Sequence, residues 1–284
     1  AIANLILDPV FIFVFGLGIR GAAIATVLSQ ILSAAFVLYF LRKKTELKVR
    51  LLSGEEIRYC GRRAKNIISL GTAGFIMQLT NSLVTICCNN VLSVTGGDLY
   101  ISVMTIVSSI RQIIDTPIHA ITEGSSPVIS YNYGARRPKR VFQSWLTMSV
   151  MAILYTLLAW GVILFAPRFL IGIFSSDQAL ITDAIPALKL YFGAFVFQAL
   201  QYVGQTMFKS LGKKKFAIFF SLLRKVIIVV PLTYILPYLF HMGSDGVFLA
   251  EPVSNVLGGS ACFIVMLCTV MPELKRMAKE NSDC

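Results

Sequence analysis

The most constraining feature of this chain is a succession of apolar segments separated by polar gaps. A helix that crosses a bilayer needs about twenty predominantly apolar residues, and segments of this length and composition indicate helices. Eight apolar segments occur, with approximate bounds 2–15, 22–41, 67–93, 99–126, 144–166, 186–210, 216–240 and 246–270; the first has only about fourteen residues, and the others have twenty or more. The sequence therefore predicts an all-α polytopic membrane protein.

Composition agrees with this prediction. The chain is 56% hydrophobic and only 14% charged, against about 25% charged residues in an average globular protein. Its six cysteines form no C-x-x-C pair, and only two histidines occur. Neither a zinc site nor a disulfide framework is expected, and no organic cofactor is expected.

The gaps between the apolar segments alternate in charge. Most of the 26 lysines and arginines fall in four gaps, at 42–65, 136–140, 209–215 and 275–279. Basic loops of membrane proteins face the cytoplasm, so both chain ends are expected in the cytoplasm, with the helices in the plasma membrane. This orientation explains the net charge of +12, and no nucleic-acid partner is expected.

The gap at 42–66 is much longer than the others and is expected to be a cytoplasmic linker. It contains "SGEEI", an expected start of a short cytoplasmic helix. The chain would then comprise a first pair of helices at 1–41, the linker at 42–66, a six-helix bundle at 67–270 and a cytoplasmic tail at 271–284.

An internal repeat supports this division. "GIRGAAIATVLSQILSA" from Gly18 and "GSDGVFLAEPVSNVLGG" from Gly243 align without gaps, and each follows a helix with a proline, Pro9 or Pro231. The first two segments thus correspond to the last two, and a complete first bundle would need four further helices before them. Such repeats are typical of secondary transporters, in which two bundles rock around a central site.

Four stretches make the chain resemble the multidrug and toxin extrusion (MATE) family. They are "NLILDPVFIF", "GAAIATVLSQ", "EGSSPVISYNYGARRPKRV" and "LLRKVIIVVPLTYILP", and in the third a helix is expected to end at Pro127. The resemblance implies two six-helix lobes joined by a cytoplasmic linker, and export of organic cations in exchange for sodium ions or protons. It implies that this chain holds the last two helices of the first lobe and the whole second lobe.

An acidic side chain lies in the first apolar segment. Asn4 and Asp8 share one helical face at i,i+4 spacing, and Pro9 frees a backbone carbonyl and forms a candidate hinge. A carboxylate, an amide oxygen and a free carbonyl suit a hard cation or a proton. A charged aspartate at mid-bilayer costs about 2.5–3.5 kcal/mol. Either a bound cation compensates Asp8, or it lies near the lipid interface, or it stays protonated and bonds a neighbouring helix.

The resemblance favours a cation site. In MATE members with such a site in the first lobe, this asparagine and aspartate are joined by a threonine, which corresponds to Thr26, and by an aspartate on the first helix, which would precede this chain. The second copy of the repeat has valines, Val226 and Val230, opposite Asn4 and Asp8. The third and sixth segments, which carry acids in other members, carry none here. Coupling is therefore expected in the first lobe, and the one metal expected is a sodium ion at Asp8.

The fourth apolar segment carries a column of ionisable residues, Arg111, Asp115, His119 and Glu123, spaced four residues apart. Histidine titrates near neutrality, and ionisable groups inside a membrane are functional by default, so the column could relay protons. Alternatively, Arg111 pairs with Asp115 and His119 with Glu123 within the helix. Both interpretations stay open at this point.

Polar residues in later segments are candidates for lining a central cavity. They are Gln201, Gln205 and Arg224, the last with Lys225 beside it. Glutamines in membrane helices also bond helix to helix, and a basic side chain can reach the interface by snorkelling. Aromatic rings and thioethers in these segments would suit flat organic cations, so small cationic or aromatic molecules are the expected substrates.

The function expected from these features is secondary active export of organic cations and drugs, coupled to Na⁺ or H⁺. One alternative is a related flippase for lipid-linked saccharides, whose cavity tends to be strongly cationic; only Arg111, Arg224 and Lys225 could supply that charge here. Another is an intramembrane enzyme that uses His119 with a neighbouring acid. No Ser/His or metal-ligand motif supplies its second catalytic group, so the chain is not expected to be an enzyme.

Overall fold

The computed structural model describes residues 2–43 and 54–281, and in these two ranges it consists of helices joined by short turns. The prediction of an all-α protein is confirmed. Contacts divide the chain into two compact units, Ala1–Asn66 and Ile67–Cys284. The predicted linker and tail fall partly outside the described residues, and their assignment stays a prediction.

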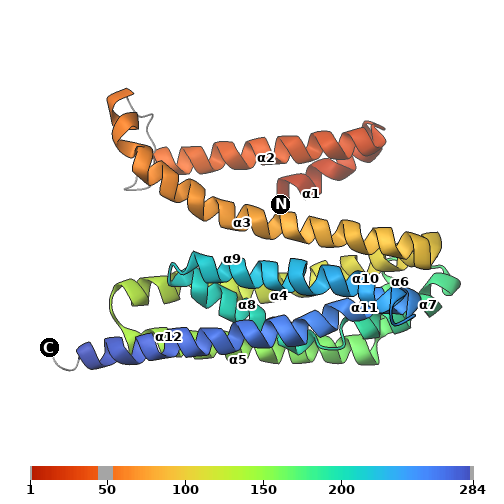
Figure 1. Cartoon of the computed structure of the whole chain (residues 1–284). Coiled ribbons are helices and arrows are strands. Elements are labelled where there is room, and N and C mark those ends of the chain that lie inside the picture. Colours follow the sequence, from red (N-terminus) through yellow and green to blue (C-terminus); the bar gives the residue numbers. More distant parts are fainter. Residues whose placement is uncertain (1, 44–53, 282–284) are drawn as a thin grey trace. The chain divides into compact units, whose positions relative to one another are not determined.

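The first unit is a helical hairpin (Figure 1). Its elements are α1 (Ile2–Pro9), the π-helical turn η1 (Val10–Val14) and α2 (Gly18–Lys43), which packs back against both. The turn depends on glycine, because Gly18 has a φ of 52°, a conformation that residues with a Cβ rarely adopt. A Cβ on Gly21 would lie 2.6 Å from the carbonyl oxygen of Phe11. This glycine therefore allows the two arms of the hairpin to meet.

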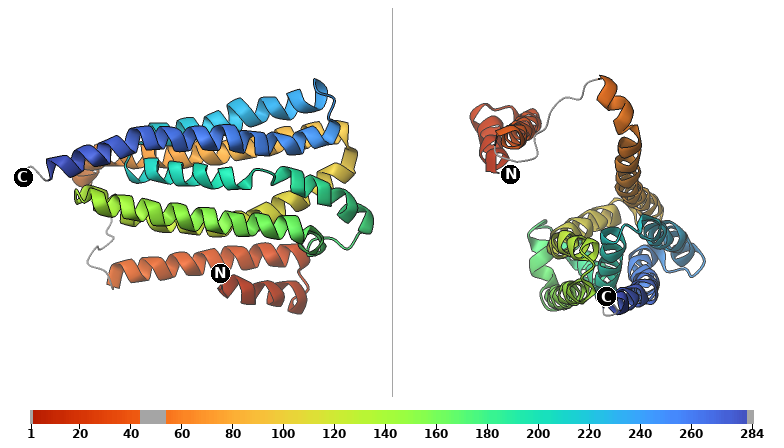
Figure 2. Two further views of the ribbon diagram at one scale, coloured as in Figure 1. Left: turned by 90° about the horizontal axis from the view of Figure 1, so that it is seen from below. Right: turned by 90° about the vertical axis from the view of Figure 1, so that its left-hand side faces the viewer.

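The second unit is a bundle in which the long helices lie side by side along one axis (Figures 1 and 2). Its elements are α3 (Gly54–Thr95, which begins before the unit boundary), α4 (Gly97–Gly134), α5 (Pro138–Phe165), α6 (Pro167–Gly172), α7 (Gln178–Tyr191), α8 (Phe195–Ser210), α9 (Lys214–Leu222), η2 (Leu223–Val229), α10 (Val230–Tyr238), α11 (Gly243–Ser254), η3 (Asn255–Gly259) and α12 (Ser260–Glu280). The predicted apolar segments all fall on these helices and on those of the first unit.

Four stretches of the described chain are long and apolar enough to cross a membrane: α2, α5, Lys214–Tyr238 and Gly243–Glu280. A fifth is added if α7 and α8, which are bent by 50° at a short break, count as one span. The stretch Ile2–Val14 is apolar but shorter. α4 has the length of a span but carries Arg111 and Asp115 near its middle, and these two residues belong to the site described below.

Three helix boundaries differ from the expectation. "SGEEI" does not begin a separate short helix, because α3 runs unbroken from Gly54 to Thr95. α4 does not end at Pro127 but continues to Gly134, since a proline removes one backbone hydrogen bond and membrane helices tolerate that loss. The segment predicted at 186–210 begins earlier, at Gln178, and is broken between α7 and α8.

Two clusters of buried apolar side chains hold the second unit together. The first includes Leu92, Ile110, Leu188, Phe195 and Phe248, and the second includes Ile129, Met148, Val203, Phe208 and Cys262. Lipid tails are as apolar as these side chains, so in a bilayer close packing, and not escape from water, is what holds such helices together. Glycine contributes to this packing: a Cβ on Gly259 would lie 2.3 Å from the carbonyl oxygen of Phe197.

The two copies of the internal repeat have the same local geometry. The alignment pairs Gly18 with Gly243, and both have a positive φ, 52° and 56°. It also pairs Gly21 with Gly246, and a Cβ on Gly246 would lie 2.8 Å from the backbone nitrogen of Pro237. Both copies thus turn at a left-handed glycine and cross at a second one. We call α1–α2 the first hairpin and α9–α12 the second hairpin.

The two hairpins also contain the three π-helical turns of the described chain, η1, η2 and η3. Each lies within three residues of a proline, namely Pro9, Pro231 and Pro252. Proline removes a backbone donor and crowds the preceding turn, and π turns are frequent at functional sites. Two of these turns, η2 and η3, carry side chains of the site described below.

Candidate functional site

A cavity of about 550 Å³ lies within the second unit. Side chains from α3, α4, α7, α8, α9, η2 and α11 line it, and Val84, Cys88 and Met104 of the first apolar cluster form part of its wall. Its ionisable lining residues, apart from tyrosine and cysteine, are Arg111, Asp115, His119, Arg224, Lys225 and Glu251. A polar cavity of this size among apolar helices is suited to a small-molecule ligand.

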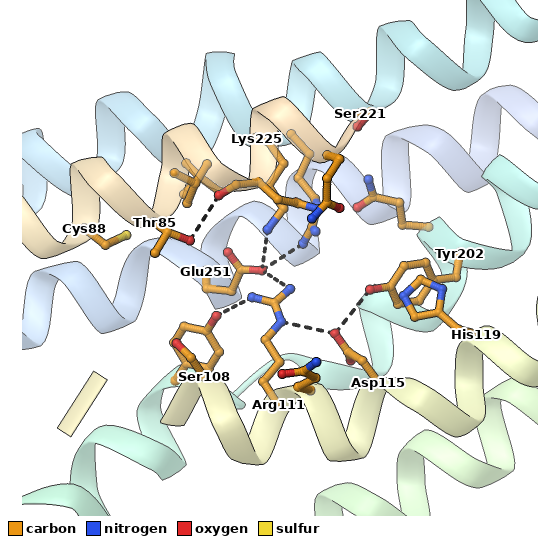
Figure 3. Close-up of a pocket in the computed structure, with 18 of the residues that line it drawn as sticks. Thr85, Cys88, Ser108, Arg111, Asp115, His119, Tyr202, Ser221, Lys225 and Glu251 are labelled. Atoms are coloured by element: carbon orange, nitrogen blue, oxygen red, sulfur yellow. Dashed lines mark hydrogen bonds and ion pairs between the residues drawn. The ribbon is translucent and has the colours of Figure 1, made fainter. Parts of the chain in front are cut away.

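Glu251 is the centre of the charged lining (Figure 3). Its Oε1 atom lies 2.8 Å from Nη2 of Arg111, 3.1 Å from Nη1 of Arg224 and 3.3 Å from Nζ of Lys225. The exposed fractions of Glu251, Arg224 and Lys225 are only 4%, 4% and 7%. Buried charges must be paired and hydrogen-bonded to persist, and here one carboxylate oxygen serves three cations.

The charges of this group do not cancel. Besides Glu251, the cations face one more acid, Asp115, whose Oδ2 atom lies 3.2 Å from Nε of Arg111. With Lys225 protonated and His119 neutral, three cations and two carboxylates leave one excess positive charge. We call Arg111, Arg224 and Lys225 the basic cluster.

Local structure explains how the basic cluster is assembled. Arg224 and Lys225 are consecutive residues of the π turn η2, and both face the cavity. A Cβ on Gly258 would lie 2.8 Å from Cγ of Arg224, so this glycine leaves room for the stem of the arginine. The guanidinium of Arg224 also donates to Oδ1 of Asn255 in η3. The widened turns of η2 and η3 therefore support the same side chain.

A second polar group surrounds Asp115, which lies beside Arg111 (Figure 3). The carboxylate accepts hydrogen bonds from Nε2 of Gln198, at 3.2 Å, and from the hydroxyl of Tyr202, at 3.3 Å. The ring of His119 lies 4.6 Å from the ring of Tyr202. Asp115 is thus well supplied with donors, because Arg111 approaches it as well.

Two buried polar atoms of the cavity lining have no hydrogen-bond partner in the described part of the chain: Nε of Arg224 and Oε1 of Gln201. Native proteins pair nearly all such groups, and leaving one unpaired costs about 1–3 kcal/mol. Two of the residues that line the cavity therefore each carry one buried polar atom without a partner in the described part of the chain.

The column predicted on the fourth segment does not act as one unit. Arg111, Asp115 and His119 line the cavity, and the predicted pair of Arg111 with Asp115 forms. The predicted pair of His119 with Glu123 is wrong, because Glu123 is exposed and pairs with Lys209 of α8 at 2.9 Å. Glu123 thus pairs with a lysine of a neighbouring helix and not with His119 of its own helix.

The predicted cavity-lining residues Arg224, Gln201 and Gln205 all line the cavity. All three are buried, with exposed fractions of 4%, 4% and 5%. Snorkelling of Arg224 to the interface is therefore excluded in this structure.

The predicted cation site lies in the first hairpin, and the structure assembles part of it. Nδ2 of Asn4 donates to Oδ1 of Asp8 at 3.2 Å, and both residues are half-buried. Thr26 is exposed, and its hydroxyl donates to the carbonyl of Ala22 on its own helix. Among residues 2–43 and 54–281, no hydrogen bond joins Thr26 to Asp8. Pro9 lies where α1 meets η1, as a hinge requires.

Glu251 is the residue that sequence reasoning missed. It is an acid inside an apolar segment, the same signal that drew attention to Asp8. The gapless repeat alignment also places it opposite Thr26, a predicted site residue. Either observation was sufficient to select Glu251 as a candidate.

Comparisons with known proteins give the same picture. The MatE family model matches residues 73–235. Multidrug export protein MepA of Staphylococcus aureus (strain NCTC 8325 / PS 47) is 25% identical over 266 residues, which cover 93% of this chain and 57% of that protein. A structure described as the outward-facing conformation of a multidrug resistance MATE family transporter of the MOP superfamily has a TM-score of 0.84 at 24% identity, covering 98% of this chain and 61% of the other.

A further solved structure has the same fold. It is a MOP superfamily transporter from Pyrococcus furiosus Vc1 (DSM3638), described as having a binding pocket of reverse polarity that suggests a different function. Its TM-score is 0.82 at 24% identity, and the match covers 97% of this chain and 61% of that one. These identities support a common fold.

A bundle of membrane helices around a polar cavity is the architecture of a membrane transporter. The chain belongs to the MatE family, whose model covers more than half of it. It spans 57% of the length of the curated relative described above. The relatives named here are transporters, not enzymes.

Proposed function

We propose that the complete transporter containing this chain exports small organic molecules across the plasma membrane in exchange for Na⁺ or H⁺, with no other cofactor. In this proposal both chain ends face the cytoplasm, and four further helices complete the lobe to which residues 1–41 belong. The lipid bilayer is its surroundings, and nucleic acid is not a partner.

The observation that carries the proposal is the polar cavity of about 550 Å³ in the second unit. Its walls combine carboxylates with the rings of Tyr191 and Tyr202, which suits flat organic cations. A cationic group would be accommodated beside these rings, since Asp115 already accepts hydrogen bonds from Arg111, Gln198 and Tyr202. Similarity to a protein named for multidrug export supports this substrate class.

Asp8 is the proposed coupling residue. It is half-buried in the first hairpin, hydrogen-bonded to Asn4 and adjacent to the junction of α1 with η1. Loading a cation or proton on Asp8 would neutralise it and shift the balance between conformations that bend differently at Pro9. Thr26 would join the site only if its hydroxyl left the carbonyl of Ala22.

Substitution of Asp8 tests this proposal. Asp8→Asn in the complete transporter should abolish ethidium efflux driven by a sodium or proton gradient in everted vesicles. The matched control is Asp98→Asn, which removes an exposed acid at the start of α4 and should leave efflux unchanged. Efflux and ion dependence that survive Asp8→Asn would refute the assignment of Asp8.

One observation favours a second candidate function, a flippase for lipid-linked saccharides. Such a cargo needs a cationic cavity, and the structure brings Arg111, Arg224 and Lys225 together around Glu251. Movement of a fluorescent phosphate-linked lipid between leaflets of reconstituted vesicles, lost in Arg224→Gln, would favour this candidate over export of organic cations.

A further inference from the structure

The cations around Glu251 outnumber its single negative charge. Arg111, Arg224 and Lys225 all approach the same oxygen, Oε1, from helices on different sides of the cavity. Figure 3 shows Arg111 reaching the carboxylate from α4 and Lys225 reaching it from the opposite side. The geometry is that of a site for an acid group, with Glu251 occupying it.

Other groups in the cavity do not supply the missing negative charge. Asp115 already accepts hydrogen bonds from Arg111, Gln198 and Tyr202. The remaining acids that the structure describes do not line this cavity. A buried excess charge is costly, so an additional anion would be bound favourably.

An unpaired donor marks the place of that anion. Nε of Arg224 is buried in the cavity lining without a partner in the described residues, while Nη1 of the same guanidinium is engaged by Glu251 and Asn255. Guanidinium groups bind carboxylates and phosphates with two adjacent N–H donors. Within the described residues, Nε of Arg224 and Oε1 of Gln201 thus each lack a partner, and both residues line the cavity, so a ligand oxygen at the arginine and a ligand donor at the glutamine would complete their hydrogen bonding.

We propose that the basic cluster is a subsite for an acid group, a carboxylate, sulfonate or phosphate, on molecules that enter the cavity. The acid group pairs with Arg224 and Lys225, and Glu251 is its internal competitor. The cavity then has a subsite for an acid group at Arg224 besides the aromatic rings that suit cations, so its ligands include organic anions as well as cations. This inference rests on the proposed function, because it takes the cavity to be the substrate site.

Binding of a matched ligand series tests the subsite. The probes are 1-naphthalenesulfonate, the neutral 1-naphthalenemethanol and the cation 1-naphthylmethylammonium, measured by equilibrium dialysis on the complete transporter in phosphatidylcholine nanodiscs. The wild-type protein should bind the sulfonate at least about tenfold more tightly than the neutral probe, because charge-assisted hydrogen bonds contribute about 1.5–3 kcal/mol. Equal binding of these two probes would overturn the proposal.

Two substitutions should shift the affinity in opposite directions. Arg224→Gln removes the free donor and one charge, and should weaken sulfonate binding about ten- to hundredfold. Glu251→Gln removes the carboxylate that competes for the basic cluster, at nearly constant side-chain volume. This variant should bind the sulfonate more tightly than the wild type, and the sulfonate should raise its thermal stability. A merely structural role for Glu251 predicts weaker binding in both variants and would overturn the proposal.

Controls keep the result interpretable. Lys209→Gln removes a cation that pairs with Glu123 outside the cavity and should leave sulfonate binding unchanged. If Glu251→Gln does not fold, Lys225→Gln is measured instead, alongside Arg224→Gln. Sulfonate affinity equal to that of the wild type in both of these variants would refute the subsite. Loss of binding in Lys209→Gln would equally refute it, since the effect would then be general electrostatics.

The acid group could belong to a soluble molecule or to a lipid. Sulfonate binding in nanodiscs that contain phosphatidylglycerol distinguishes these sources. If the lipid competes with the sulfonate, and this competition disappears in Arg224→Gln, the subsite binds a lipid headgroup. If the lipid leaves sulfonate binding undiminished, the subsite binds a soluble anion. Both outcomes support the subsite.

Failure of this inference is distinguishable from failure of the proposed function. Ion-driven transport of naphthylmethylammonium without sulfonate binding would overturn the subsite and leave the exporter standing. Sulfonate binding with the expected variant pattern, but no ion-driven transport of any probe, would leave the subsite standing and refute the exporter.

Discussion

The first and second hairpins share a framework and differ in their chemistry. Gly18 and Gly243 both adopt a positive φ, and a Cβ on Gly21 or on Gly246 would meet the backbone of the facing arm. In the first hairpin, a half-buried Asp8 has one amide partner. In the second hairpin, valines replace Asn4 and Asp8, and a buried Glu251 serves several cations.

The comparison shows that the backbone frame and the charge of a site are determined by different residues. Glycines at the turn and at the crossing specify how the hairpin closes, and they recur in both copies. The ionisable side chains occupy other positions and have changed sign between the copies. Function is thus carried by side chains placed on a repeated fold, with a cation expected at Asp8 and an acid group at the basic cluster.

The largest expected difference between the hairpins is in stability. Glu251→Gln leaves the buried Arg224 and Lys225 and the half-buried Arg111 without their shared carboxylate, and should lower the free energy of unfolding by about 3–5 kcal/mol. Asp8→Asn changes a half-buried group with one hydrogen bond and should cost about 1 kcal/mol or less. Reversible unfolding of the complete transporter in mixed micelles measures both. Equal losses would show that the two sites are not different in kind.

The shared frame gives the next largest effect. Gly21→Ala and Gly246→Ala should each destabilise the protein by about 1–3 kcal/mol, because the added methyl group meets backbone atoms at 2.6 and 2.8 Å. Gly161→Ala is the control: nothing lies within 4 Å of its Cβ position in α5, and alanine should stabilise that helix by about 0.5–1 kcal/mol. Reversible unfolding in the same mixed micelles measures all three changes. If Gly246→Ala were as stable as the wild type, the crossings of the two hairpins would not be equivalent.

Much of the fold could be predicted from the sequence because its signals are local. Apolar length and polar gaps located the long helices but not the short α6, and the repeated G-x-x-G start marked the two hairpins. The boundaries at Gly54, Gly134 and Gln178 were less predictable, because a helix continues past a proline or a polar stretch when its neighbours pack against it.

The candidate site was harder to predict because it joins residues far apart in the chain. Arg224 was selected as cavity-lining, but its convergence with Arg111 on Glu251 depends on tertiary packing of α4, η2 and α11. Thr26 illustrates the opposite problem. Its hydroxyl can bond its own helix or a neighbour, and in this structure it bonds its own helix.

The smallest effect is expected at the pair of Glu123 with Lys209, which belongs to neither hairpin. Both side chains are substantially exposed, at 55% and 39%, so the pair should contribute less than about 1 kcal/mol in a double-mutant cycle. Glu123→Gln should also leave ion-driven efflux unchanged. A loss of ion dependence in Glu123→Gln would restore the proton-relay interpretation of the column on α4.

The central claim is that the two hairpins divide the work, with the coupling ion at Asp8 and the acid group at Arg224. The most direct test measures ion-driven ethidium efflux and naphthalenesulfonate binding on the same preparations of Asp8→Asn and Arg224→Gln. The account predicts that Asp8→Asn loses ion-driven efflux and keeps sulfonate binding, whereas Arg224→Gln loses sulfonate binding and keeps its dependence on the ion gradient. Loss of both properties in either variant would contradict it.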